Sequence, residues 1–321
     1  MIPDPSGLTF NNDGTKMFVS GSTGAGVAEY TLSTAFDVST ASHVDTLSVS
    51  AQDTYPKGHA FNSDGTKMFV VGLTGKDVNE YTLSTGFDVS TASFVDSFSV
   101  SSQETAPVGI TFNTDGTKMF VIGHSGADVN EYTLSTGFDV STASYDSNFS
   151  VSSQEIYPSS VTFSNDGKKM FVIGINDDEV NEYSLSTGFD VSTASFVGNF
   201  SVSPGVPAPN CLAFNNDGTK MFVGDHLGKD INEYTLTTPF SLVDVSGEHT
   251  GDVIDTSSTS NKDSDVDGDT LTVTQIKKSG GSNSAVSSGT TNTNGTSVTG
   301  TYGVLTLSLI HISEPTRQEA I

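Results

Sequence analysis

Hydrophobic positions along this chain fall into short runs that recur with a fixed spacing. The run from Phe10 to Val19 returns almost unchanged at Phe61, Phe112, Phe163 and Phe214, so each copy starts 51 residues after the last (10 to 61, for example). A fixed period of this length is typical of proteins built from stacked repeats. The pattern therefore predicts one structural unit, repeated along most of the chain.

The second copy predicts four short antiparallel strands, over residues 58–61, 67–72, 78–83 and 94–100. Asp64-Gly65 separates the first two strands, because glycine tolerates the positive φ of a tight hairpin. Four strands repeated at about 40 to 50 residues are typical of a propeller blade. The rival interpretation is a row of separate β-sandwich domains. A unit of this size is too small to hold such a core alone, so neighbouring units must share their apolar faces.

We therefore predict an all-β protein whose residues 1–246 form a five-bladed β-propeller of four-stranded blades, or an arc of a larger propeller. The blades are expected near residues 7–57, 58–108, 109–159, 160–210 and 211–246. The fifth copy departs from the others after Leu236, and Val243-Asp244-Val245 is the candidate for its fourth strand.

A lysine and a glutamate recur in every copy, as in Lys16 and Glu29 or Lys67 and Glu80. If the second and third strands form a hairpin, the two side chains are diagonal neighbours on one face, and opposite charges there contribute about 0.2 to 1 kcal/mol. We favour a structural pair in each blade. The alternative is that the five glutamates form an acidic ring that binds a ligand.

The composition limits the partners that the protein can have. The formal net charge is −25 and the estimated pI is about 4.2, so the surface repels the phosphates of nucleic acids. The same charge argues against docking to anionic lipid, and no segment has the length and hydrophobicity for membrane insertion. Such a surface favours divalent cations. We expect no nucleic-acid partner and no insertion into a membrane.

The sequence offers few candidates for catalysis. Cys211 is the only cysteine, which excludes an internal disulfide, and a small buried thiol is the favoured interpretation. His59, His124 and His226 are expected near blade edges or turns, without sharing one equivalent position. The chain has no Gly-x-Ser-x-Gly elbow, no His-Glu-x-x-His and no phosphate-binding glycine loop. We expect no catalytic residue and no bound organic cofactor.

A metal site in a propeller channel would draw side chains from several inner strands. The positions expected there are mostly small and non-ligating: Gly7, Gly58, Gly109, Ser160 and Cys211. This lowers the expectation of a metal-dependent hydrolase without removing it as an alternative.

The repeat also resembles a known group of propeller proteins. The signature apolar-x-Phe-x-x-Asp-Gly-x-Lys followed by an apolar run, as in Ile110 to Val121, resembles bacterial repeat propellers of the YVTN and WD40-like groups. The resemblance covers residues 7–242 and implies a propeller fold. It implies little about function, because propellers include binding modules and enzymes alike.

The segment after the repeats has a different character. Residues 251–255, 261–273 and 300–307 resemble a VCBS-type, cadherin-like β-sandwich module, which residues 247–308 would form in part. That family occurs in large secreted or surface-attached bacterial proteins, often adhesins. Residues 309–321 fit neither pattern and resemble a non-native tail.

A candidate calcium site lies in this module. Four aspartates alternate around Gly268, and such a turn can supply the oxygen ligands that Ca²⁺ prefers. The four are Asp263, Asp265, Asp267 and Asp269. The resemblance to cadherin-like modules also implies calcium at such turns. An acidic, solvated turn entering a strand explains the pattern as well, and both interpretations stay open.

Three hypotheses on function follow. The first is a non-enzymatic repeat protein, secreted or on the surface of a bacterium, that serves as an adhesion or ligand-binding scaffold for a carbohydrate or a protein. The second is a metal-dependent, lactonase-like propeller hydrolase. The third is a purely structural segment of a large extracellular array. We favour the first, and expect the chain to be part of a longer polypeptide.

Overall fold

The computed structural model describes residues 5–21, 24–203 and 205–242, and four short strands further along the chain. The chain divides into two compact units, Met1–Val245 and Ser246–Ile321. In the second unit, β20 (Gln275–Ile276) pairs with β21 (Ser284–Ala285), and β22 (Thr296–Thr299) with β23 (Val304–Leu307). The rest of the predicted cadherin-like module, the tail and the candidate strand at residues 243–245 lie outside the described residues.

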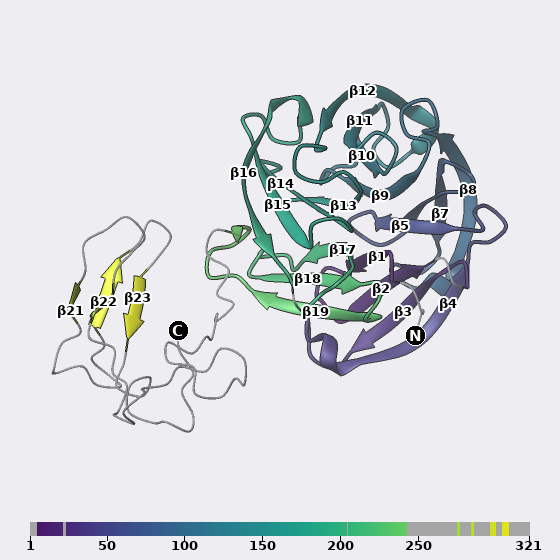
Figure 1. Cartoon of the computed structure of the whole chain (residues 1–321). Coiled ribbons are helices and arrows are strands. Elements are labelled where there is room, and N and C mark those ends of the chain that lie inside the picture. Colours follow the sequence, from purple (N-terminus) through teal and green to yellow (C-terminus); the bar gives the residue numbers. More distant parts are fainter. Residues whose placement is uncertain are drawn as a thin grey trace. The chain divides into compact units, whose positions relative to one another are not determined.

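The first unit is an all-β propeller of five blades, as predicted (Figure 1). Each of the first four blades is an antiparallel sheet of four strands in sequence order, and the described part of the fifth has three. The blades are β1 (Gly7–Phe10), β2 (Lys16–Gly21), β3 (Gly26–Leu32) and β4 (Ala41–Ser48); β5 (Pro56–Phe61), β6 (Lys67–Gly72), β7 (Asp77–Leu83) and β8 (Ala92–Ser99); β9 (Pro107–Phe112), β10 (Lys118–Gly123), β11 (Asp128–Leu134) and β12 (Ala143–Ser150); β13 (Pro158–Phe163), β14 (Lys169–Gly174), β15 (Glu179–Leu185) and β16 (Ala194–Ser201); and β17 (Pro209–Phe214), β18 (Lys220–Asp225) and β19 (Asp230–Thr235).

A tight turn joins the first two strands of each blade, and its glycine is required by both conformation and space. In the third blade, Gly116 has φ +72°, and a Cβ there would lie 2.2 Å from the ring of Phe138. Phe138 itself has φ +57°, and its amide donates to the Gly116 carbonyl. The aromatic ring therefore lies directly over the turn, which only glycine permits.

A short 3₁₀ helix, which the sequence did not predict, leads into each fourth strand. Asp88 caps η2 by accepting a hydrogen bond from the Ser90 amide, as expected of an Asx turn. The four described turns are η1 (Val38–Thr40), η2 (Val89–Thr91), η3 (Val140–Thr142) and η4 (Val191–Thr193). They hold the connection close to the neighbouring blade.

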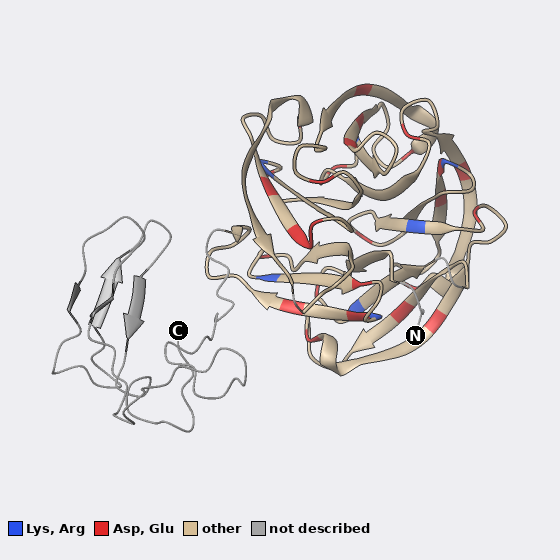
Figure 2. Cartoon of the chain, in the orientation of Figure 1, with Lys and Arg blue, Asp and Glu red and all other residues tan. Residues whose placement is uncertain are grey.

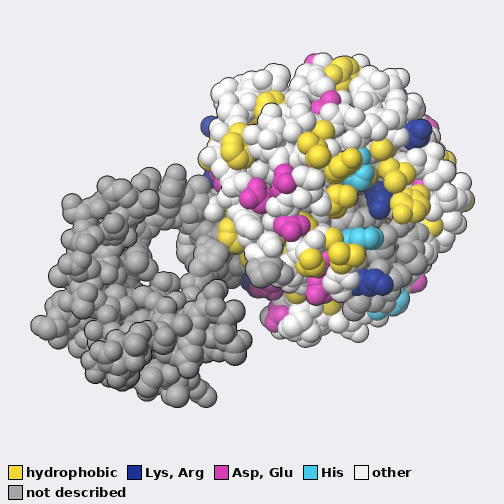
Figure 3. Space-filling model, in the orientation of Figure 1, with side chains coloured by type: hydrophobic (Ala, Val, Ile, Leu, Met, Phe, Trp, Pro, Cys, Tyr) yellow, Lys and Arg dark blue, Asp and Glu magenta, His cyan; other side chains and the backbone are white. Residues whose placement is uncertain are grey.

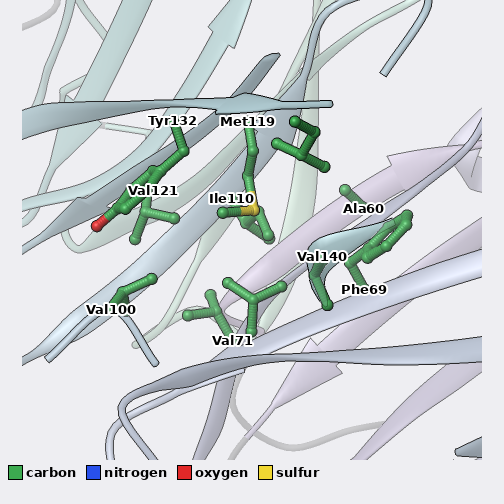
Figure 4. Close-up of a cluster of buried hydrophobic side chains, with 11 residues drawn as sticks. Ala60, Phe69, Val71, Val100, Ile110, Met119, Val121, Tyr132 and Val140 are labelled. Atoms are coloured by element: carbon green, nitrogen blue, oxygen red, sulfur yellow. The ribbon is translucent and has the colours of Figure 1, made fainter. Parts of the chain in front are cut away.

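The hydrophobic cores lie between blades. One cluster joins Phe69 and Val71 of the second blade to Val121 and Tyr132 of the third (Figure 4). Every other buried cluster also draws on two adjacent blades. Separate β-sandwich domains would each have a core of their own, so that rival interpretation is wrong.

The ring closes with the fifth blade packed on the first. Cys211 and Phe222 share a buried cluster with Leu8 and Met17. The Asn210 amide donates to the Pro5 carbonyl at 3.1 Å. Closure excludes the open arc of a larger propeller. Cys211 is a buried thiol, as expected, and burial raises its pKa to about 12.

The recurring Lys–Glu pairs link neighbouring blades. Lys67 Nζ lies 2.7 Å from Glu80 Oε1 and also donates to the Phe138 carbonyl of the next blade. The second oxygen of Glu80 accepts from the Val140 amide of that blade at 3.0 Å. The pairs are therefore structural, and the interpretation as an acidic ligand-binding ring is wrong. Acidic side chains elsewhere are spread around the described propeller (Figures 2 and 3).

We expect replacement of the buried glutamate to loosen the blade junction. In Glu131→Gln the amide can accept from only one of its two donors, Lys118 or the Val191 amide, so the other donor is left facing an NH₂ group. We expect a loss of about 2 to 4 kcal/mol of unfolding free energy in urea. The matched change Glu233→Gln, at a residue whose side chain is 27% exposed, should cost under about 1 kcal/mol. Equal losses would contradict the structural role.

A second variant tests the turn. Gly116→Ala forces an ordinary residue into a left-handed conformation and against the Phe138 ring. We expect it to lose at least about 2 kcal/mol. Gly198→Ala is the control, because a Cβ there meets nothing within 4 Å. A midpoint of denaturation unchanged in Gly116→Ala would show that the turn is not constrained.

Candidate functional site

A cavity of about 300 Å³ lies in the central channel, bordered by the inner strands β1, β5, β9, β13 and β17. Each of these strands is the first in its sheet and has a neighbour on one side only. An edge strand leaves a row of backbone N–H and C=O groups free of sheet pairing. The channel therefore offers backbone donors and acceptors from all five blades.

The lining of the cavity is polar and uncharged. Hydroxyl and amide side chains such as Thr9, Thr111, Asn113 and Thr162 lie among small and aromatic residues. No Asp, Glu, Lys or Arg is among the lining residues, and His59 is the one titratable group there. Such a lining fits a neutral ligand that carries several hydroxyl groups.

His59 lies at the centre of a hydrogen-bonded network between the first two blades. Its Nε2 lies 2.8 Å from Thr9 Oγ1, and its Nδ1 lies 2.8 Å from Ser20 Oγ. Ser20 Oγ donates to the Lys57 carbonyl at 2.5 Å. A Cβ on Gly7 would lie 2.3 Å from Ser20 Oγ and 2.9 Å from His59 Nδ1, so glycine there makes room for the network.

Burial and the hydrogen-bond partners of His59 determine its charge and which ring nitrogen carries the proton. Burial lowers the pKa of His59 to about 3, so the ring is neutral at ordinary pH. Because the Ser20 hydroxyl gives its proton to a carbonyl, it accepts from His59 Nδ1–H. Nε2 is then an acceptor, and Thr9 Oγ1 donates to it. The three side chains thus form a hydrogen-bonded chain in which the Thr9 hydroxyl donates to the His59 imidazole and Ser20 orients that imidazole.

This network is confined to one of the five blade junctions. At the positions equivalent to Thr9, Ser20 and His59, the next junction has Ala60, Val71 and Ile110, all in its apolar core. In the remaining three junctions, the position of Thr9 holds threonine or alanine (Thr111, Thr162 and Ala213), and the position of Ser20 holds isoleucine or glycine (Ile122, Ile173 and Gly224). The position of His59 holds a buried aliphatic residue, which is Val161, Leu212 or Leu8. Only the first junction therefore combines a serine hydroxyl and an imidazole with the threonine.

Sequence reasoning missed this site. His59 lies within β5, the inner edge strand of its blade, so its expected place near a blade edge is confirmed. His124 and His226 do share one equivalent position, in the turn after β10 and the turn after β18, two repeats apart. Aligning the five copies at the position of Leu8, His59 and Ile110 would have shown a single polar residue in an apolar column.

The channel residues do not fit a metal ion. Within residues 5–21, 24–203 and 205–242, no three His, Cys, Asp or Glu side chains stand close enough to share one. We therefore derive no step through a metal. Asp263, Asp265, Asp267 and Asp269 lie outside the described residues, so the calcium site stays a prediction.

A second cavity, of about 460 Å³, lies between the fifth and first blades and is lined by residues such as Met17, Tyr30 and Ile231. Three other junctions place a fourth-strand phenylalanine against the tyrosine equivalent to Tyr30, as Phe98 does against Tyr132. This cavity thus lies where a fourth-strand side chain packs against the tyrosine at other junctions. The channel, with its polar network, is the stronger candidate for a functional site.

No protein-family model matches the sequence, and neither does any curated protein. Among solved structures, the chain is similar to a protein of unknown function from Desulfotomaculum acetoxidans, with 18% identity and a TM-score of 0.46 over 76% of this chain and 72% of that one. It is similar to a provisionally assigned 6-phosphogluconolactonase from Bacteroides fragilis (16%, TM-score 0.46, 73% and 66%). A third is the periplasmic gluconolactonase PpgL of Pseudomonas aeruginosa (16%, TM-score 0.45, 74% and 67%).

These names contradict our first hypothesis, a non-enzymatic surface scaffold, which we give up together with the expectation that the protein is not an enzyme. The likeness itself extends to the fold alone. Among the residues described here, no helix is both long and apolar enough to cross a membrane.

The network makes stability depend on pH through His59. The pKa of His59 is about 3 when folded and near 6.5 when unfolded, so between these values the unfolded chain binds more protons. Stability is therefore lost as the pH falls from about 7 toward 3. His59→Leu should remove this pH-dependent contribution. When the pH falls from 7 to 4.5, the unfolding free energy measured in urea should drop by about 2 to 3 kcal/mol more in wild type than in the variant.

The matched control is His43→Asn, which changes a histidine on the exposed strand β4. This control should follow wild type at both pH values. An identical pH dependence for wild type and His59→Leu would contradict the neutral, buried imidazole.

Proposed function

We propose that the protein is a hydrolase of small, neutral cyclic esters, of the sugar-lactone class, and that the reaction takes place in the channel. The observation that carries the proposal is the Thr9–His59 pair, which lines an uncharged cavity with donors and acceptors for a hydroxylated ligand. Two similar solved structures carry the names of lactone hydrolases, one of them as a provisional assignment, and these names support the same substrate class.

The geometry supports a two-step acyl transfer. In the first step, Thr9 Oγ attacks the lactone carbonyl while its proton passes to His59 Nε2. The ring C–O bond then breaks, and His59 Nε2 gives the proton to the leaving oxygen. In the second step, His59 Nε2 takes a proton from water, which attacks the Thr9 ester, and the proton returns to Thr9 Oγ as the hydroxy acid leaves. Ser20 holds the imidazole with Nε2 toward Thr9 throughout.

The low pKa of His59 favours a reactive ester over an amide. A neutral imidazole whose conjugate acid has a pKa of about 3 is a weak base, and the efficiency of general-base catalysis falls with basicity. Such a base suits a substrate with an electrophilic carbonyl and a good leaving group. A sugar lactone meets that condition, whereas a peptide does not.

The uncharged lining also argues for an unphosphorylated substrate. A phosphate enclosed in the cavity would lose its hydration without gaining a Lys or Arg partner, because none lines the cavity. The net charge of −25 adds repulsion. We therefore expect gluconolactone to be a better substrate than its 6-phosphate.

Two further expectations belong to this proposal. The protein is proposed to work outside the bacterial cytoplasm, which fractionation of the native organism tests. Calcium is proposed to bind at Asp263, Asp265, Asp267 and Asp269. Titration of Ca²⁺ into the full chain tests this by calorimetry, and the absence of heat would favour the solvated turn.

The direct test follows acid release from glucono-1,5-lactone with the purified full chain in a pH-stat. Wild type should hydrolyse the lactone above the buffer rate, and Thr9→Val should lower kcat at least about 100-fold because it removes the nucleophile. Thr162→Val removes a lining hydroxyl at the equivalent position of the fourth blade and should retain kcat within a few-fold. A wild-type rate equal to the buffer rate, or equal rates for both variants, would contradict the proposal.

A further inference from the structure

Asparagine side chains tie the hairpins together at one end of the channel. Each hairpin between the first two strands of a blade carries a residue equivalent to Asn12. Asn12 Nδ2 donates to the Ser63 carbonyl of the second blade at 2.6 Å. Asn165 Nδ2 donates to the Asn216 carbonyl at 2.7 Å, and Asn216 Nδ2 donates to the Asn12 carbonyl, which joins the fifth blade to the first. We call this set of bonds the asparagine belt.

The belt is interrupted on one side. The equivalent residues of the second and third blades are Ser63 and Thr114, whose hydroxyls lie closer to the backbone than an asparagine amide. Among the described residues, no hydrogen bond of this kind joins Ser63 to Thr114 or Thr114 to Asn165. Three of five junctions are therefore bridged, and two neighbouring junctions are open.

The cavity reaches the hairpin end of the channel at the first three blades. At this end its lining includes the exposed residues Asn12, Ser63 and Thr114, together with Asn62 and Asn113. Neither Asn165 nor Asn216 is part of the lining. The cavity therefore lies beside the open Ser63–Thr114 junction, with the bridging Asn12 at its margin.

We propose that the gap beside Ser63 and Thr114 is the entrance to the channel, and that these two short side chains admit small, neutral, hydroxylated ligands. Asparagine at both positions would extend the belt across the two open junctions. The hydroxyls present there can also accept and donate hydrogen bonds to a passing polyol. The nature of the ligand rests on the proposed function, whereas the position of the entrance does not.

The test measures entry without requiring hydrolysis. Thr111→Cys places a thiol in the cavity on strand β9, and its modification by methyl methanethiosulfonate, a small neutral reagent, reports access. The native Cys211 is buried with a raised pKa and should react slowly, which the wild-type chain measures. In the Thr111→Cys background, Ser63→Asn with Thr114→Asn should slow labelling at least about tenfold.

Matched controls separate closure from disturbance. Ser63→Ala with Thr114→Ala removes the hydroxyls without offering a bridge and should label at the parent rate. Asn12→Ser should widen the entrance and raise the rate, which keeps the test decisive if the asparagine pair fails to fold. Labelling at the parent rate in a folded asparagine pair, or no gain in Asn12→Ser, would overturn the entrance. If the Thr111→Cys series labels as expected but wild type hydrolyses no lactone, the proposed function alone is refuted.

Discussion

A buried glutamate in each of the first four blades holds this propeller together by serving two blades at once. One carboxylate oxygen is paired with the lysine of its own blade, and the other accepts a backbone amide from the next blade, as Glu131 does with Lys118 and Val191. Burying a carboxylate is costly unless both oxygens find donors. Here they do only when the next blade is in place. The lysine donates to that blade as well, so the pair favours stacked blades over isolated ones.

The closed ring determines what the channel can be. Five inner strands leave a cavity of about 300 Å³, which admits a small molecule, and their open edges contribute backbone groups. In the other four junctions an aliphatic side chain occupies the position of His59. Against this background, Ser20 and His59 form a polar exception that the hydrogen bonds among Thr9, Ser20 and His59 make tolerable. The exception lies where the cavity is, which is why we assign function to it.

The repeat in the sequence predicted the blades because local patterns determine them. The Asp-Gly turn, the aromatic and β-branched strand residues and the Lys–Glu spacing all act within one copy, and the structure confirms each of them. The fold class followed from these local signals. Closure of the ring did not, because it depends on contacts between residues such as Asn210 and Pro5 at opposite ends of the propeller.

The site could not be predicted in the same way. Thr9 and His59 lie in different copies, and only the packing of one blade on the next brings Oγ1 within 2.8 Å of Nε2. The glycine at position 7 looked like a small, non-ligating channel residue, yet it makes room for Ser20 and His59. A single histidine in an apolar column was a signal, but its meaning depended on a serine and a threonine from the preceding blade.

Native-state hydrogen exchange at the backbone amides of Val140, Val191 and Leu242 tests most directly whether the buried glutamates hold the blades together. These amides donate to Glu80, Glu131 and Glu182 of the preceding blades. If the glutamates hold the blades together, the three amides exchange only through global unfolding. Their protection from exchange is then as high as that of the inner-strand amides. Exchange at the rate of an exposed loop, while the strands stay protected, would contradict the account.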